Sequence, residues 1–407
     1  MKEIYNRLVS TNLSRPTAFI PFITDEPKFH NYFCLPNENC SKKYLTDDVF
    51  GQGYDKNKYL SKIKSVAEML ERLCLCNPPK NLFTSKFKRE SFQDPSSFFC
   101  YSSDQISDKK ERIDKIKNGI YKWIISKNIT TGKEIYVPAQ MVFLSSNFKN
   151  EFALRKEQIS TGAALGDINE ERAFKSGFLE SVERDGIMAF YLKELKGRKM
   201  KDFPKQIQDL INYLERYNLE THIFDVTTDL KIPITLAMIL DKTSIGDAVN
   251  IGSKADLNYF NSIKGSIMES IQCRRLGRSY RYSKKDEDIP TENKITSLEK
   301  RLIYWAQKER IEDIRDLIEE TPKNSYKDIG IKRISLEDAI ENVKKKGFQI
   351  LVTDITLPEI KQKGFEVLKV TIPELHPLYL DERAKSLFSV HYGEIKNNSK
   401  LKPHFIT

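Results

Sequence analysis

The chain has 407 residues, and its 67 Lys and Arg against 57 Asp and Glu give a formal net charge of +10. Hydrophobic residues make up 39% and aromatic residues 11%, which excludes an intrinsically disordered chain, and no apolar run approaches the ~18 residues of a membrane span. The first twenty residues lack the basic-then-apolar order of a signal peptide, so we expect a cytoplasmic protein whose six cysteines are thiols.

The positive charge does not by itself indicate a nucleic-acid-binding protein. Lys and Arg are densest in residues 193–201 and 274–281, and acidic residues are interspersed almost everywhere else. Nucleic-acid binding needs clustered cations that neutralise phosphates, so we expect no nucleic-acid partner. The second cluster also contains Tyr280, and its arginines would suit a polyphosphate or a peptide equally well.

The first half of the chain predicts mixed secondary structure. Residues 1–53 contain four prolines and predict short extended pieces. Apolar residues recur every three or four positions from Leu60 to Leu73, which indicates an amphipathic helix with Asp55 as its N-cap. The elements expected next are two strands joined by a turn within 119–144, a Gly-containing loop at 160–167 and a second long helix at 169–192.

The second half continues the mixture. Alternating or continuous apolar runs predict strands, and longer periodic stretches predict helices. The strands expected are 221–227, 232–240, 348–353 and 365–372, and the helices expected are 256–275 and 298–308. Helices and strands alternate irregularly along the whole chain, so the fold class is α+β.

Two of the expected helices carry the same motif. Glu68-Met69-Leu70-Glu71-Arg72 and Glu180-Ser181-Val182-Glu183-Arg184 both read E-x-x-E-R. At about 100° per residue the two glutamates share a helix face and the arginine lies beside the first. A single copy is accounted for by a surface salt bridge worth about 0.2–0.5 kcal/mol. The recurrence after 112 residues favours two structural halves that converge on one site.

Four carboxylates in one cavity would repel each other strongly without cations. Mg²⁺ prefers oxygen ligands and binds through carboxylates and substrate phosphates, while arginines offset phosphate charge. The hypothesis is a Mg-nucleotide site in which Glu183→Gln abolishes turnover and leaves the melting temperature unchanged or higher. No G-x-x-x-x-G-K-[ST] occurs, which disfavours a P-loop NTPase.

These motifs, with other segments in the same order, resemble the YcaO family, whose members are ATP-dependent enzymes that activate peptide backbone amides. The resemblance spans most of the chain. It implies an α+β, YcaO-type ATP-binding fold in which two related helix-sheet halves meet at one nucleotide site. The segments that carry it, besides the two E-x-x-E-R motifs, are residues 51–53, 137–139, 160–166, 269–274, 354–356 and 372–377.

The resemblance also implies further site residues. Asp167 and Glu171 have the spacing of a family Asn and Glu that serve metal and nucleotide, but one extra residue precedes Glu180. On an undistorted helix this turns Glu171 by about 100°, so Glu170 or a helix bulge is an alternative. Lys64 replaces a usual Ser, and Arg275 rivals Arg274. The implied nucleotide-binding set is Glu68, Glu71, Arg72, Asp167, Glu171, Glu180, Glu183, Arg184 and Arg274, and its metal ligands are Glu68, Glu71, Glu171, Glu180 and Glu183.

The chemistry implied by the resemblance begins when a nucleophile adds to an amide carbonyl. ATP then phosphorylates the oxygen, and phosphate leaves. A Cys, Ser or Thr side chain as nucleophile gives an azoline, which we favour, and an external sulfide gives a thioamide. Azoline-forming members often end in a Pro-rich tail whose carboxylate enters the active site, so Thr407 is the expected catalytic residue. A frayed end is the alternative, and deleting residues 403–407 is expected to change stability little.

The expected organisation is a single YcaO domain over residues 1–407. Its approximate subregions are 1–150 and 151–290, each with one E-x-x-E-R helix, and 291–407 with the C-terminal helices, strands and tail. The resemblance implies a precursor peptide or protein as substrate and a ThiF-like or TfuA-like partner protein. A homodimer is left open, and no membrane partner is expected. The alternative function is an inactive YcaO-like scaffold or an RNA-binding accessory protein.

Overall fold

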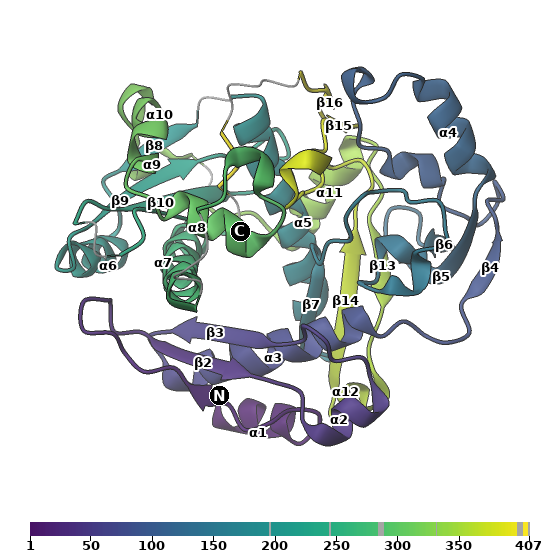
Figure 1. The fold of residues 1–407 in the computed structure, drawn as a ribbon, viewed down its shortest axis with the longest axis horizontal. Helices are drawn as coiled ribbons and strands as arrows, with labels where there is room; N and C mark the ends of the chain where they lie inside the picture. The colour runs from purple at the N-terminus through teal and green to yellow at the C-terminus, as the bar shows by residue number, and fades with distance from the viewer. Residues whose placement is uncertain (195–196, 244–245, 284–288, 331, 397–401, 406–407) are drawn as a thin grey trace. The chain divides into compact units, whose positions relative to one another are not determined.

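The computed structural model describes residues 1–194, 197–243, 246–283, 289–330, 332–396 and 402–405 (Figure 1). The chain forms two compact units. The first contains residues 1–181 and 347–375, and the second contains residues 182–346 and 376–407. These boundaries differ from the three consecutive subregions expected from the sequence, because residues 347–375, near the end of the chain, belong to the first unit.

The first unit contains two sheets. The order of one is β1-β2-β3, and the order of the other is β4-β5-β13-β14-β7, with β6 paired to β5. The strands are β1 Ala18–Phe19, β2 His30–Cys34, β3 Gly51–Asp55, β4 Phe83–Lys86, β5 Ile120–Asn128, β6 Glu134–Pro138, β7 Ala163–Asp167, β13 Leu351–Asp354 and β14 Phe365–Thr371. The helices are α1 Lys2–Val9, α2 Glu38–Lys43, α3 Lys58–Cys76, α4 Lys109–Asn118 and α12 Pro358–Lys361. Helix α5, Arg172–Leu192, begins in this unit and ends in the second.

The second unit is built on the sheet β11-β10-β9-β8-β12 and a short hairpin, β15 with β16. The strands are β8 Arg198–Lys201, β9 Leu219–Asp225, β10 Ile234–Asp241, β11 Val249–Ala255, β12 Lys323–Ser325, β15 Phe388–Ser389 and β16 Gly393–Glu394. The helices are α6 Lys205–Glu215, α7 Tyr259–Ser283, α8 Leu298–Trp305, α9 Arg310–Asp313, α10 Arg315–Glu320 and α11 Leu336–Lys345. Every residue of β10 is buried, as its continuous apolar run requires.

The structure confirms most of the expected elements and corrects several details. Helix α3 begins at Lys58, and its N-cap is Asn57, whose side chain accepts from Tyr59 and Leu60 N–H. Asp55 instead ends β3 and accepts the Asn57 N–H at 2.9 Å. The expected loop at 160–167 contains β7, because these residues pair with β14. Residues 1–53 form the expected short strands and also two helices, α1 and α2, which the sequence analysis did not predict.

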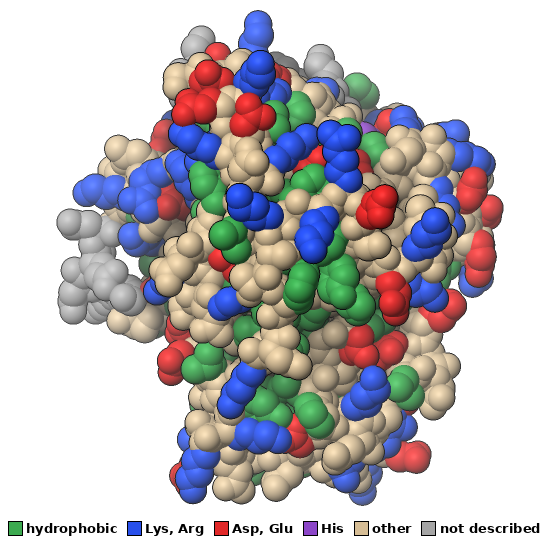
Figure 2. Space-filling view, turned by 90° about the vertical axis from the view of Figure 1, so that its right-hand side faces the viewer, with side chains coloured by type: hydrophobic (Ala, Val, Ile, Leu, Met, Phe, Trp, Pro, Cys, Tyr) green, Lys and Arg blue, Asp and Glu red, His purple; other side chains and the backbone are tan. Residues whose placement is uncertain are grey.

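The surface and the cysteines agree with the composition. All six cysteines are free thiols. None of the helices in the described residues is long and apolar enough to cross a membrane. On the face shown in Figure 2, Lys and Arg are interspersed with Asp and Glu, so this face shows no continuous basic stripe of the kind that follows a phosphate backbone.

Candidate functional site

In the first unit, close packing of α3 on β3 places Glu68. A side chain at Gly51 would put its Cβ 2.0 Å from the Ser65 carbonyl oxygen, so only glycine permits this approach. The Gln52 N–H therefore donates to Glu68 Oε2 at 2.8 Å. Arg72 Nη2 donates to Glu68 Oε1 at 2.7 Å, as the spacing predicted. The first E-x-x-E-R motif thus presents a fixed carboxylate beside a fixed guanidinium.

Glu71 and Glu180 lie close enough within the first unit to influence each other. Burial, followed by repulsion from Glu180 and Glu68, raises the pKa of Glu71 well above its usual value. Glu180 Oε2 accepts the Gly162 N–H at 3.0 Å. Two carboxylates from helices more than 100 residues apart in sequence are thus forced together. A bound cation would offset their repulsion, so these residues fit a divalent metal.

A buried lysine completes this cluster. Lys369 on β14 is 2% exposed, and its Nζ donates to the carbonyls of Ile159, Ser160 and Thr161 at 3.0, 2.9 and 2.6 Å. Burial lowers the pKa of Lys369 to about 8, against the attraction of Glu180 and Glu71. The sequence analysis missed this residue. The available signal was its position two residues after Val367, on the inward side of an apolar strand.

In the second unit, Glu183 of α5 is held by β11. Its Oε1 accepts the Ser253 hydroxyl at 2.7 Å, and its Oε2 accepts the Ala255 N–H at 2.9 Å. Burial acts to raise the pKa of Glu183, but Lys254, Arg184 and these hydrogen bonds outweigh burial and lower it. Glu183 is therefore a stabilised carboxylate, which favours a loss of stability on its neutralisation over the unchanged or higher melting temperature expected from the sequence.

Arg184 links Glu183 to a second carboxylate in this unit. The Arg184 guanidinium lies 3.9 Å from both Glu183 Oε1 and Glu269 Oε1. Glu269 of α7 also accepts the Ser253 N–H at 2.8 Å. Burial and repulsion from Glu183 raise the pKa of Glu269 to about 7. Glu269 belonged to a segment that resembles the YcaO family, but no role was assigned to it from the sequence.

Arg274 is buried farther along α7. Its Nη2 donates to Asp241 Oδ2 at 2.8 Å, and its Nη1 donates to the Asp247 carbonyl at 2.7 Å. These contacts tie α7 to the end of β10 and to the residues just before β11. Arg275, the alternative candidate for the nucleotide-contacting arginine, is half-buried on the same helix. That Arg274 contacts the nucleotide stays a prediction.

The residues expected just before the second motif lie outside a helix. Asp167 ends β7 and forms an ion pair with Arg7, whose hydrogen bond, with that of the Asn169 N–H, lowers the pKa of Asp167. Glu170 and Glu171 are exposed and precede α5, which starts at Arg172. Because α5 starts only at Arg172, Glu171 is not turned by the 100° expected for a residue within a regular helix.

Thr407 lies outside the described residues. The segment before it is packed: Pro403, His404 and Phe405 are buried. Arg301 donates to the His404 carbonyl, and His404 Nε2 donates to the Tyr379 carbonyl at 2.6 Å. The Phe405 ring packs against Tyr191 and Trp305. The expectation that this segment contributes little to the core is wrong.

Among the described residues, no three His, Cys, Asp or Glu side chains are grouped so as to hold a metal by themselves. Mg²⁺ seldom requires such a cage, because it keeps several waters and uses one or two carboxylates with substrate phosphates. The pairs Glu71 with Glu180, and Glu183 with Glu269, offer carboxylates in that number.

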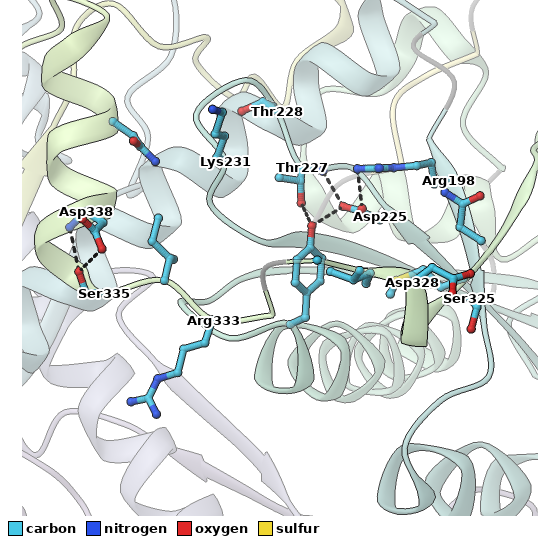
Figure 3. Close-up of a pocket in the computed structure, with 17 residues that line it drawn as sticks. Arg198, Asp225, Thr227, Thr228, Lys231, Ser325, Asp328, Arg333, Ser335 and Asp338 are labelled. Atoms are coloured by element: carbon cyan, nitrogen blue, oxygen red, sulfur yellow. Dashed lines mark hydrogen bonds and ion pairs between the residues drawn. The ribbon is translucent and has the colours of Figure 1, made fainter.

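A separate pocket of about 610 Å³ lies in the second unit. Figure 3 shows Arg198 and Asp225 towards one end, and at the other end Asp338 of α11 with Ser335, the N-cap of that helix. Asp225 accepts from Arg198 Nη2 at 2.9 Å and from the Tyr259 hydroxyl at 3.2 Å. The sequence motifs pointed to none of these residues.

Comparison with known proteins decides the family. The family model described as YcaO cyclodehydratase, ATP- and Mg²⁺-binding, matches residues 52–376. The chain belongs to the YcaO family. Membership confirms the predicted resemblance and α+β fold class, and the family description confirms the ATP and Mg²⁺ cofactors. It also supports, in general terms, an ATP-dependent enzyme. No curated protein sequence matches the chain.

Solved structures show the same YcaO fold at low sequence identity. A heterocyclase in complex with substrate and cofactor has a TM-score of 0.72 at 17% identity, over 96% of this chain and 53% of that chain. YcaO from Methanopyrus kandleri, bound with AMPPCP and Mg²⁺, has a TM-score of 0.66 at 14% identity, over 99% and 96%. The E. coli microcin synthetase McbBCD complex has a TM-score of 0.63 at 11% identity, over 88% of each chain. The chain thus spans about half the length of the first heterocyclase.

Proposed function

We propose that this YcaO chain uses ATP and Mg²⁺ to activate a peptide backbone amide by phosphorylating its oxygen. The observation that carries the proposal is the crowding of Glu71 and Glu180, on two E-x-x-E-R helices, in a chain of this family. Such crowding costs stability. Arg72 and Lys369 act against the raised pKa of Glu71 without outweighing it, and a bound cation would offset the repulsion further. A nucleotide site accounts for this cost.

Each charged residue has a defined role in the proposal. Mg²⁺, when bound, would neutralise the triphosphate. Glu68, Glu71, Glu180 and Glu183 would hold the metal and Arg72 and Arg184 would offset phosphate charge, with Asp167, Glu171 and Arg274 as further candidates. Because Glu68 and Glu183 each accept a backbone N–H, their carboxylates are oriented before nucleotide binds, which lowers the reorganisation needed for transfer.

The favoured reaction is cyclodehydration. A Cys, Ser or Thr side chain adds to the preceding carbonyl carbon, ATP phosphorylates the resulting oxygen, and phosphate leaves as the azoline forms, with ADP as the second product. Two of the similar structures are a heterocyclase and a microcin synthetase complex, which supports this choice over thioamidation. Thr407 is the proposed catalytic carboxylate that orients the reacting group.

The substrate is proposed to be a precursor peptide presented by a partner protein. The heterocyclase chain in complex with substrate is nearly twice as long as the part that this chain matches, and the microcin synthetase is a complex of several proteins, also seen with pro-MccB17 bound. In this proposal a separate ThiF-like or TfuA-like protein supplies peptide recognition.

The test is ADP release by the purified protein with Mg²⁺, with and without Cys-, Ser- and Thr-containing peptides and the neighbouring gene products. Loss of one water from the peptide supports the azoline, and replacement of oxygen by sulfur in the presence of sulfide supports the thioamide. No nucleotide binding and no turnover under any combination would contradict the proposal. Salt-dependent RNA binding in that case would favour the scaffold alternative.

A further inference from the structure

Two adjoining pockets in the second unit are lined by residues that the proposed nucleotide site does not use. The larger, of about 610 Å³, is the pocket of Figure 3, and its volume is in the range of ligand sites in proteins, about 300–1,000 Å³. A smaller pocket of about 320 Å³ shares four of its lining residues, Arg198, Asp225, Thr227 and Thr228. The two pockets together form one elongated hollow, called the groove below, which suits a chain better than a compact molecule.

Arg198 lines both pockets, and a chain of hydrogen bonds fixes its direction (Figure 3). Its Nη2 donates to Asp225 Oδ2 at 2.9 Å, and Asp225 Oδ1 accepts the Thr227 N–H at 3.0 Å and the Tyr259 hydroxyl at 3.2 Å. Asp225 and Tyr259 are each 5% exposed, whereas the Arg198 side chain is 56% exposed. The buried aspartate therefore holds one nitrogen of the guanidinium and leaves the rest of its planar fork accessible. Such a fork can bind a carboxylate through two parallel hydrogen bonds.

The other charges of the larger pocket restrict the class of ligand. Lys231 and Arg333 are exposed, and neither side chain pairs with a carboxylate among the described residues. In this part of the chain the charges of the lining cancel, because its cations are Arg198, Lys231 and Arg333 and its acids are Asp225, Asp328 and Asp338. A polyphosphate would need a net positive lining. A chain with one or two carboxylates and many amides fits better, because the exposed acids can accept its N–H groups.

Strand β12 gives the larger pocket a wall suited to an extended chain. Asn324 and Ser325 of β12 line the pocket. β12 is the last strand in the order of its sheet, and it pairs with β8 in parallel. A strand at a sheet edge has backbone N–H and C=O groups without a ladder partner on its outer side. An extended peptide can be recognised there through its main chain while its side chains enter neighbouring pockets.

We propose that the groove binds an extended peptide segment that carries acidic side chains, with Arg198 holding one carboxylate and Lys231 and Arg333 attracting the charge beside it. The inference rests on the proposed function and deepens it, because it gives this chain its own contact with the peptide substrate besides the one that the partner protein supplies. None of the lining residues belongs to the proposed nucleotide-binding set. Peptide binding and nucleotide binding can therefore be altered separately.

The experiment measures peptide binding to the full chain by fluorescence anisotropy. The probe is a fluorescein-labelled, C-terminally amidated octapeptide of Ala and Ser with two central glutamates, and its neutral analogue has two glutamines in their place. The wild type should bind the glutamate peptide more tightly, and this preference should weaken at high salt. Equal affinity for the two peptides would overturn the inference, because no carboxylate would then be recognised.

A double variant removes the two cations without disturbing an ion pair. Lys231→Gln with Arg333→Gln should weaken binding of the glutamate peptide about five- to tenfold, as two partly exposed charge contacts allow. The matched control is Lys205→Gln with Lys308→Gln, which removes the same charge from two exposed lysines that line neither pocket. The control should bind as the wild type does. Equal affinity in the two double variants would overturn the inference.

Arg198 is tested by its conservative replacement, because an uncharged side chain would leave the buried Asp225 without a cation. Arg198→Lys keeps the charge but loses the planar fork. Binding of the glutamate peptide should weaken, with thermal unfolding recorded to show that the protein is folded. Wild-type affinity in a folded Arg198→Lys would overturn the assignment of a carboxylate to Arg198.

Competition and calorimetry separate the remaining outcomes. Inorganic phosphate or free glutamate that displaces the peptide at concentrations near the peptide's own Kd would show a site for small anions and overturn the peptide assignment. Wild-type binding of Mg²⁺ with a non-hydrolysable ATP analogue, without binding of the glutamate peptide, would overturn the inference and leave the proposed function standing. Peptide binding without nucleotide binding would instead reject the proposed function, and with it the groove as a substrate contact.

Discussion

At the scale of single residues, glutamates at the same position of the two E-x-x-E-R motifs need not have the same effect on stability. Burial and neighbouring carboxylates raise the pKa of Glu71. The pKa of Glu183 is instead lowered, because Lys254, Arg184 and two hydrogen bonds outweigh its burial. A carboxyl with a raised folded-state pKa costs stability above its unfolded pKa, and one with a lowered pKa adds stability there. Two substitutions with the same chemistry should therefore move the melting temperature in opposite directions.

Glu71→Gln should raise the free energy of unfolding at pH 7.5 by about 1–3 kcal/mol, because it removes a buried and repelled charge. The gain should shrink as the pH falls towards about 4, where Glu71 is protonated in both states. Urea unfolding at the two pH values measures it. ATP turnover should fall in the same protein, and a variant that is more stable yet fully active would contradict the assignment of Glu71 to the metal.

Glu183→Gln should abolish ATP turnover and lower the free energy of unfolding at pH 7.5 by about 1–3 kcal/mol, because an amide cannot replace the charge that faces Lys254 and Arg184. Differential scanning calorimetry checks the stability, and ADP release checks the turnover. A melting temperature equal to or above that of the wild type would show that the hydrogen bonds from Ser253 and Ala255 do not govern the Glu183 charge.

At the scale of elements, helix α5 is tied to residues 376–392 of the second unit by one buried aspartate. Asp185, next to Arg184, accepts the His376 N–H at 2.7 Å, the Tyr392 hydroxyl at 3.1 Å and His391 Nδ1 at 2.9 Å. His391 Nε2 lies 2.9 Å from Asp229 Oδ1. The histidine therefore bridges two carboxylates, and it holds the helix turn that carries Arg184.

The His391 bridge predicts a pH dependence of stability. Burial acts to lower the pKa of His391, but Asp185 and Asp229 outweigh it and raise the pKa above its usual value. The stabilisation is complete below about pH 6.5 and is lost as the pH rises through the raised folded-state pKa. The unfolding free energy of the wild type should therefore fall between pH 6 and pH 9 by about 1–2 kcal/mol more than that of His391→Gln. Parallel pH profiles in urea unfolding would count against the bridge.

At the scale of the whole molecule, the C-terminal segment is part of the second unit's core. His404 and Phe405 pack against Tyr191, and the buried Arg301 donates to the His404 carbonyl. Arg301 also pairs with Glu382 at 2.7 Å. Removing this segment would expose an apolar surface and take one acceptor from a buried guanidinium.

Two truncations separate the core role from the proposed catalytic role of Thr407. Deleting residues 403–407 should lower the free energy of unfolding by about 2–5 kcal/mol through lost burial and the lost carbonyl. Deleting residues 406–407 keeps those contacts, so its melting temperature should lie closer to that of the wild type, while peptide modification falls sharply if the Thr407 carboxylate orients the reaction. Full product formation by the shorter truncation would reject a catalytic tail and favour thioamidation.

Local sequence was sufficient to predict the family, the ATP and Mg²⁺ cofactors and the α+β class. Periodic apolar residues predicted α3 and α5 because a helix face is encoded within a few turns, and the repeated E-x-x-E-R motif is likewise local. The ion pair of Arg72 with Glu68 followed directly from its four-residue spacing.

The tertiary structure alone decided the electrostatic character of each site residue. Lys369 faces carbonyls about 210 residues away, and Glu269 depends on a glycine-permitted approach of α7 to β11, so neither can be inferred from neighbours in sequence. The opposite pKa shifts of Glu71 and Glu183 have the same origin. Each is the second glutamate of an E-x-x-E-R motif, but burial and the charges brought near them by distant segments determine which carboxylate is stabilised.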